Sequence, residues 1–186
     1  MDVVVAITGA SGVEYGITLL KTLYKDPEIN VDLIISDDGK VLLEQEGSVS
    51  YSQLVKDAVN TYRNSDMAAP VSSGSRRFDA MVIVPCTMST LAKIANGISD
   101  NLITRVASVA IKEHRKLVIV PRETPLSAIQ LRNMAVLSDQ DVIILPASPG
   151  FYHQPEDISG VYRFIASRIL DQLGIDNDLI TRWGTD

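Results

Sequence analysis

Short apolar runs recur along the chain, and each leads through a small polar turn into apolar residues at helical spacing. Five runs predict strands, over residues 3–8, 31–35, 81–84, 116–120 and 141–145. They are rich in Val, Ile and Leu, which is typical of strands buried on both faces of a parallel sheet. Apolar residues three or four apart predict helices over residues 17–23, 38–46, 52–62, 91–96, 101–113, 127–137 and 158–173.

The alternation of strand and helix predicts the fold class. Five repeats with short connections favour an α/β protein, a doubly wound, Rossmann-like three-layer fold with a mainly parallel sheet. At 186 residues the chain is most simply one domain, residues 1–186. Residues 63–79 have no clear period and predict a loop. Residues 174–186 are expected to be a C-terminal tail, whose lone Trp183 needs a packing surface near the site.

Small polar turns follow four of the predicted strands. The turns contain Gly9, Ala10 and Ser11 after the first strand, Ser36 after the second, Thr87, Met88, Ser89 and Thr90 after the third, and Arg122 after the fourth. The carboxyl ends of parallel strands share one sheet edge, where helix N-termini favour anions. We therefore predict a phosphate-bearing cofactor there.

Three simpler interpretations of the candidate residues stay open. Gly9, Gly12 and Gly16 depart from the dinucleotide fingerprint G-x-G-x-x-G, so the first turn alone is equally consistent with a tight turn that binds nothing. Ser89 or Thr90 is by itself more simply a helix cap. Glu46, at the end of a predicted helix, is by itself more simply a solvated carboxylate.

Composition narrows the functional classes. The net charge of −6 argues against nucleic-acid binding. One cysteine, Cys86, excludes an internal disulfide and favours a reducing compartment. No apolar run approaches the roughly 20 residues of a membrane span, and the start lacks the basic residues of a signal peptide. We expect a cytoplasmic protein.

Eight segments together resemble a known family. They look like the UbiX-type flavin prenyltransferases and cover nearly the whole chain in order; RETP and GFYHQP are the more specific parts. The segments are GASG at 9–12, SSGS at 72–75, PCTMSTLAKIANG at 85–97, DNLITR at 100–105, KEHRKLVIVPRETPL at 112–126, PASPGFYHQP at 146–155, SRILDQLG at 167–174 and RWG at 182–184.

The resemblance implies an activity and an assembly. Members join a dimethylallyl group from dimethylallyl phosphate to reduced FMN, without a metal. The product, prenylated FMN, serves a partner decarboxylase of the UbiD type. Members assemble as dodecamers with active sites at subunit interfaces, so we expect a homo-oligomer here.

The resemblance also implies roles for single residues. The flavin contacts fall on the turn residues already named. The catalytic positions are Ser11, Glu46 and Glu123. The prenyl-phosphate contacts are Lys112, Tyr152 and Arg168, with Arg105, Ser73, Gly74 and Ser75 nearby, and Trp183 as a shield of the site from water. Cations and a hydroxyl suit the leaving phosphate, and a carboxylate or the released phosphate suits the proton removal that closes the new ring.

Two other functions are weighed against this one. FMN-dependent cysteine decarboxylases share the fold and use a histidine base. This chain has only His114 and His153, neither in an early strand-to-helix turn, which disfavours that class. A non-catalytic FMN-binding protein needs only the flavin contacts, and it leaves unexplained Lys112, Tyr152, Arg168 and Glu123. We expect FMN to bind without a covalent link to Cys86.

Overall fold

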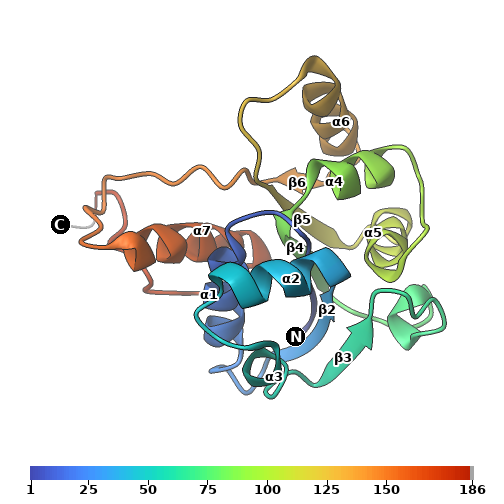
Figure 1. Ribbon diagram of the computed structural model, residues 1–186, viewed down its shortest axis with the longest axis horizontal. Coiled ribbons are helices and arrows are strands. Elements are labelled where there is room, and N and C mark those ends of the chain that lie inside the picture. The colour runs from blue at the N-terminus through green and yellow to red at the C-terminus, as the bar shows by residue number, and fades with distance from the viewer. Residues whose placement is uncertain (185–186) are drawn as a thin grey trace.

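A parallel six-stranded sheet forms the centre of the molecule (Figure 1), seen in a computed structural model that describes residues 1–184. The strand order is β3-β2-β1-β4-β5-β6, and every neighbouring pair is parallel. The strands are β1 (Asp2–Ile7), β2 (Asn30–Ile35), β3 (Asn60–Arg63), β4 (Ala80–Cys86), β5 (Lys116–Pro121) and β6 (Ile143–Ile144). The predicted doubly wound, Rossmann-like fold class is confirmed.

Helices cover both faces of the sheet. One layer holds α1 (Val13–Leu23), α2 (Asp37–Glu46), α3 (Tyr51–Leu54) and α7 (Ile158–Leu173). The other layer holds η1 (Pro70–Ser72), α4 (Met88–Ala95), α5 (Leu102–Lys112) and α6 (Ala128–Ser138). Within residues 1–184, no helix has both the length and the apolar character needed to cross a membrane.

Alternation along β1 builds two hydrophobic cores. Val3, Val5 and Ile7 belong to the core with α1 and α7, whereas Val4 and Ala6 belong to the core with α4 and α5. Successive side chains of a strand point to opposite faces, so a strand of continuous Val, Ile and Ala serves both cores at once. This explains why the strands appear as unbroken apolar runs in the sequence.

The order of the strands makes the carboxyl ends of β1 and β4 the switch point of the sheet, hereafter called the crevice. β1 pairs with β2 on one side and with β4 on the other, so the chain winds away from this point in both directions. At such a switch point the two connecting turns separate, and ligands bind outside the carboxyl ends of the strands. Two of the predicted polar turns, those after β1 and β4, flank this crevice.

The predicted helix over residues 52–62 is wrong. Only one turn, α3, is helical, and the chain then forms the edge strand β3. The apolar residues that suggested a helix do not share a buried face, because Leu54 is buried while Val59 is 59% exposed. Thr61 and Tyr62 are strand-forming residues that pair with β2, which supplies the backbone partners. The predicted fifth strand is also shorter, with only residues 143–144 in β6.

Candidate active site

Thr8 joins the two turns that border the crevice. Its hydroxyl donates to the carbonyl of Pro85 at 2.9 Å and accepts from the backbone N–H of Thr87 at 2.8 Å. The Thr8 N–H also donates to Pro85 O at 3.2 Å. Thr8 is only 2% exposed, so these bonds are shielded from water. The turn after β1 and the turn after β4 are therefore held at a fixed separation.

Three predicted site residues from three segments meet at the turn after β1. The Ser11 hydroxyl donates to Glu46 Oε2 at 3.0 Å, and the Gly12 N–H donates to the same oxygen at 2.9 Å. Arg122 Nε donates to the Ser11 carbonyl at 3.1 Å. Gly12 precedes α1 with φ 97°, a conformation that favours glycine. A carboxylate at this helix N-terminus is electrostatically favourable.

The turn after β4 presents hydroxyls and backbone donors. Thr87 caps α4, since its hydroxyl accepts from Thr90 N at 3.1 Å and donates to the Thr90 hydroxyl at 2.9 Å. The cap is thus Thr87 and not Ser89 or Thr90. Met88 is buried, while Ser89 is exposed at the first turn of the helix. The N–H groups of a first helical turn lack intrahelical partners, so this end of α4 suits an anion.

Ser36, Gly9 and Ala10 have structural contacts of their own. The Ser36 hydroxyl accepts from Gly39 N at 3.0 Å and so caps α2. A Cβ at Gly9 would lie 2.4 Å from Asp38 Cβ, so the close approach of α2 requires glycine there. Ala10 is buried. Capping accounts for Ser36 and packing for Gly9 and Ala10, and their predicted flavin contacts stay predictions.

A cavity of about 370 Å³ continues the site beyond β5. Arg122 and Glu123 line it together, with Met134 of α6 and Ser148 of the following loop. Glu123 is exposed, and its carboxylate accepts from Thr124 N at 3.1 Å. A carboxylate and a guanidinium at one cavity are suited to proton transfer beside a bound anion.

A tyrosine pair that sequence reasoning missed lies next to this site. The rings of Tyr15 and Tyr162 meet edge to face at 5.4 Å. Burial raises the pKa of both hydroxyls; Arg122 opposes this at Tyr15, while Glu14 and Glu46 add to it at Tyr162. The pair therefore lies within electrostatic reach of Arg122 and Glu46. No sequence signal distinguishes either tyrosine from an ordinary core-facing aromatic residue.

One group of predicted phosphate contacts gathers around the end of α5. Lys112 Nζ is 2.5 Å from Glu113 Oε1, and a Cβ at Gly74 would lie 2.9 Å from Lys112 Nζ. The hydroxyls of Ser73 and Ser75 lie 2.8 Å apart. Arg105 Nε donates to the carbonyl of Ser72 at 2.9 Å. The loop of residues 72–75 and the basic side of α5 thus form one polar surface.

A second group lies along α7 and the tail. The rings of Tyr152 and Trp183 meet edge to face at 5.6 Å, with Trp183 80% exposed. Arg168 contacts Asp171 at 2.5 Å, and Asp171 also accepts from Arg182 at 2.8 Å. The described part of the tail therefore packs on α7 and on Tyr152. Residues 185–186 of the predicted tail lie outside the described residues.

One chain does not bring all the predicted residues together. Lys112 ends α5 shortly before β5, whereas Arg122 follows the carboxyl end of β5. At roughly 3.3 Å per residue a strand of this length separates its ends by about 20 Å. Lys112 and Arg122 are therefore placed toward opposite edges of the sheet.

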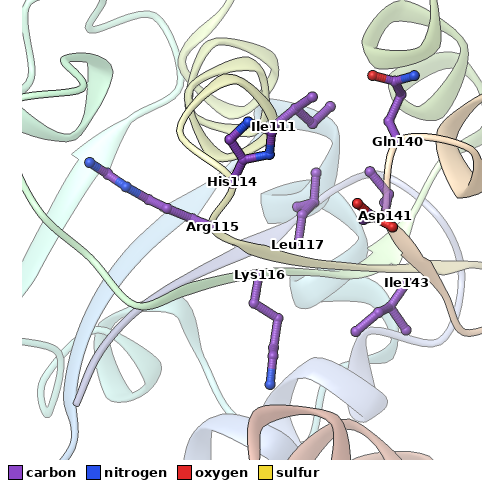
Figure 2. Close-up of a pocket in the computed structure, with 9 residues that line it drawn as sticks. Ile111, His114, Arg115, Lys116, Leu117, Gln140, Asp141 and Ile143 are labelled. Carbon is purple, nitrogen blue, oxygen red and sulfur yellow. The ribbon is translucent and has the colours of Figure 1, made fainter.

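A second cavity, of about 260 Å³, lies at the amino ends of β5 and β6 (Figure 2). His114 and Asp141 line it, each in a left-handed conformation just after a helix. Its basic residues already have partners, since Arg115 donates to Gly74 O and Lys116 to Gln172 O. None of the predicted site residues lines this cavity.

Neither histidine is placed as a base for the crevice. His114 follows α5 at the opposite sheet edge. The ring of His153 stacks on Phe164 at 5.3 Å, and its Nε2 lies 3.2 Å from Gly160 O.

Cys86 is fully buried, and burial raises the pKa of its thiol, which disfavours the reactive thiolate.

Comparisons with known proteins point in one direction. A family model described as Flavoprotein matches residues 1–169. Flavin prenyltransferase UbiX of Methanocaldococcus jannaschii is 47% identical over 185 residues, which is 100% of both chains.

Solved structures agree with this similarity. AnUbiX in complex with FMN and dimethylallyl pyrophosphate superposes with a TM-score of 0.96 at 39% identity, over 100% of this chain and 98% of its own. A dodecameric FMN-dependent UbiX-like decarboxylase from Escherichia coli O157:H7 also superposes with a TM-score of 0.96. It is 40% identical, over 98% of this chain and 99% of its own. The cysteine decarboxylase TvaF, at 17% identity and a TM-score of 0.65, shares the fold alone.

Proposed function

The chain belongs to the UbiX-type flavin prenyltransferases, and we propose that it joins the dimethylallyl group of dimethylallyl phosphate to reduced FMN in the crevice between β1 and β4. The observation that carries this proposal is the meeting of Ser11, Glu46 and Arg122 beside the hydroxyl turn that opens α4. AnUbiX, similar over the whole chain, holds FMN and a dimethylallyl donor together.

The residues of the crevice fit FMN. The exposed Ser89 and the first turn of α4 suit its phosphate. Arg122 uses Nε on the Ser11 carbonyl, which leaves its terminal nitrogens for an anion or a ring carbonyl. When bound, reduced FMN supplies the nucleophilic N5 and C6 atoms. The buried thiol of Cys86 supports binding without a covalent link.

The donor phosphate needs positive charge, and within one chain Lys112 lies toward the opposite end of β5 from Arg122. We assign it to Lys112 and Arg105 with the hydroxyls of Ser73 and Ser75, and to Arg168 with Tyr152. Positive charge and hydroxyl donors stabilise the leaving phosphate as its bond to the allylic carbon breaks. Trp183, beside Tyr152, shields the developing cation from water.

A base must remove the proton lost when the new ring closes. Glu123 is our candidate, because it is exposed at the cavity that Arg122 lines. Glu46, which accepts from the Ser11 hydroxyl, is the second candidate, and Ser11 then orients its carboxylate. The released phosphate can serve as the base in place of either carboxylate.

We infer that the site is completed by a second copy of the chain. Lys112 and Arg122 lie toward opposite ends of β5, so a neighbouring copy offers the simplest way to bring the two groups together. The E. coli relative is dodecameric, which supports the same closed assembly here.

The product and the location follow from the same activity. Prenylated FMN would pass to a UbiD-type decarboxylase. Reduced FMN is the acceptor, so we place the reaction in the reducing cytoplasm, where a free thiol such as Cys86 persists.

An anaerobic mixture of the purified protein, reduced FMN and dimethylallyl phosphate tests the proposal. We expect the flavin to gain the mass of one prenyl unit and to leave the denatured protein freely. A parallel reaction with dimethylallyl pyrophosphate identifies the preferred donor. Flavin that binds but never gains mass with either donor would indicate a binding protein instead, and reduced FMN with donor alone is the control.

A further inference from the structure

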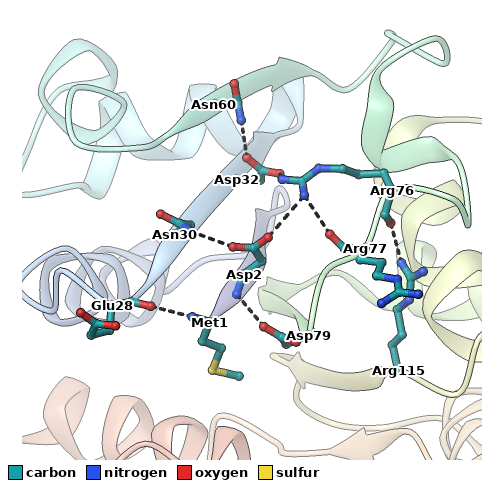
Figure 3. Close-up of polar contacts among 10 residues, drawn as sticks. All are labelled: Met1, Asp2, Glu28, Asn30, Asp32, Asn60, Arg76, Arg77, Asp79 and Arg115. Carbon is teal, nitrogen blue, oxygen red and sulfur yellow. Dashed lines mark hydrogen bonds and ion pairs between the residues drawn. The ribbon is translucent and has the colours of Figure 1, made fainter.

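A loop of residues 72–77, hereafter the 72–77 loop, is fixed by charged residues from distant parts of the chain (Figure 3). Such a loop at the surface is ordinarily mobile, because few of its backbone groups have partners. Here its carbonyls and its own Arg76 have specific partners, which come from β1, β2 and the segment just before β5.

Arg115, which lies between α5 and β5, holds the 72–77 loop through two backbone carbonyls. One terminal nitrogen donates to the carbonyl of Arg76 at 2.9 Å, and the other donates to the carbonyl of Gly74 at 2.7 Å. The guanidinium lies 4.4 Å from the ring centre of buried Phe78. A planar fork with fixed donors can hold two carbonyls at once, which an ammonium cannot do with the same geometry.

Arg76 anchors the other side of the 72–77 loop to the sheet. Its terminal nitrogens lie 3.3 Å from Asp2 Oδ2 and 3.5 Å from Asp32 Oδ2. Asp32 is only 6% exposed, and Asn60 also donates to it at 2.8 Å. A nearly buried carboxylate is costly without a partner charge. Asp32 therefore favours the position in which Arg76 stays close to it.

The fixed part of the 72–77 loop touches Lys112. A Cβ at Gly74 would lie 2.9 Å from Lys112 Nζ and 2.4 Å from Glu113 Oε1, so the loop backbone is packed directly on this ion pair. The neighbouring Ser73 and Ser75 are exposed and hydrogen-bonded to each other at 2.8 Å. The Gly74 carbonyl held by Arg115 belongs to the segment that faces Lys112.

We propose that Arg115 is a positioning residue for the donor phosphate, acting by holding the Gly74 and Arg76 carbonyls so that Ser73 and Ser75 stay beside Lys112. This inference rests on the proposed function, which assigns the phosphate to these residues. We assign Arg115 no direct contact with the phosphate, because each terminal nitrogen donates to a loop carbonyl and the guanidinium packs over the ring of Phe78. The loss of Arg115 should therefore weaken the binding of the donor phosphate and leave the binding of FMN unchanged.

Arg115→Ala and Arg115→Lys in the full chain test the inference with dimethylallyl phosphate as the probe. For Arg115→Ala we expect the KM for the donor to rise between about tenfold and a hundredfold, the scale of a misplacement near 1 Å. Arg115→Lys keeps the charge but loses the fork, so its KM should also rise. In both variants kcat at saturating donor and the Kd for FMN should stay near wild type.

Arg77→Ala is the matched control, because it removes the same charge from an exposed neighbour that contributes a backbone carbonyl to Arg76. Its KM should equal that of the wild type. Amide hydrogen exchange over residues 72–77 should be faster in both Arg115 variants and unchanged in the control. Amide exchange shows, independently of activity, whether Arg115 restrains the motion of the 72–77 loop.

Three outcomes contradict the inference in distinguishable ways. A wild-type KM or wild-type amide exchange in Arg115→Ala overturns it while the proposed function stands. If Arg115→Ala does not fold, Arg115→Lys decides by the same two measurements. A wild-type protein that transfers no prenyl group contradicts the proposed function, and the inference falls with it.

Discussion

Thr8 is a single hydroxyl that holds two turns of the crevice together. Replacing it with the similarly shaped Val removes the donor to Pro85 and leaves the Thr87 N–H without its acceptor. We expect Thr8→Val to lower the free energy of unfolding by about 1–3 kcal/mol and to weaken FMN binding. Urea denaturation and fluorescence titration measure the two effects.

Thr22→Val is the matched control for this change. The Thr22 hydroxyl donates only to the Thr18 carbonyl within α1, so its loss should leave FMN affinity unchanged. Equal FMN affinities in Thr8→Val and the wild type would show that the turns are held by other contacts.

A substitution at Glu123 tests whether this residue acts in the reaction of the flavin and not in its binding. Glu123→Gln removes a charge and a proton acceptor with almost no change of volume. We expect FMN affinity to be kept and the rate of prenyl transfer to fall by about 10²–10⁴-fold, the usual contribution of a positioned base. Lys112→Ala should instead weaken only the binding of the prenyl donor. A wild-type rate in Glu123→Gln would transfer the role to Glu46 or the released phosphate.

The chemistry of single residues was predictable only in part. Ser11, Thr87 and Arg122 could be placed on one edge, because each follows a strand recognisable from its apolar run. The bond of Ser11 to Glu46 could not, because the length and direction of α2 decide it. The Thr8 bridge was missed, since a threonine at the end of an apolar run looks like part of the strand.

At the scale of elements, strands of continuous Val and Ile were predicted well, whereas edges were not. β1, β2, β4 and β5 lie within one or two residues of their predicted bounds, because burial on both faces leaves a clear pattern. β3 was mistaken for a helix because an edge strand carries few apolar residues. β6 is short for a related reason: only one neighbour, β5, pairs with it.

Asp171 ties the tail to α7, because its carboxylate accepts from both Asn177 and Arg182. Arg182, then Arg168, hold the pKa of Asp171 below its usual range. A carboxylate whose pKa is lowered by folding stabilises the folded state fully when the pH is above its ordinary pKa of about 3.9. This contribution is lost as the pH falls through the lowered pKa. Below it, we expect Trp183 to leave Tyr152.

Trp183 is the only tryptophan, so its fluorescence reports this detachment directly. Asp171→Asn should give the detached signal already at pH 7, and Asp178→Asn, a carboxylate lost from the same tail, should not. An Asp171→Asn spectrum identical to that of the wild type would place the attachment elsewhere.

At the scale of the whole molecule, the separation of Lys112 from Arg122 predicts complementation between two impaired chains. If each site takes Lys112 from one copy and Glu123 from another, random mixing of Lys112→Ala with Glu123→Gln restores about a quarter of the sites. Unfolding and refolding the two variants together, then measuring prenyl transfer at a donor concentration too low for Lys112→Ala alone, tests this. Refolding each variant alone is the control.

The complementation test depends on the size of the assembly. A dodecamer should weigh roughly twelve times the 20.3 kDa chain in solution. A fully active monomer, or a mixture no more active than its parents, would show that one chain supplies both groups.

The central position of β1 has a consequence for synthesis on the ribosome. Val3 lies opposite Val31 on one side but opposite Ala80 on the other, so a nascent chain completes only half of its pairing early. Until residues near 80 emerge, β1 presents a bare apolar edge next to α1. Pairing between such distant segments is slow, and an unpaired edge of this kind recruits other chains. Chaperones that bind nascent chains should therefore engage this protein before β4 has left the exit tunnel.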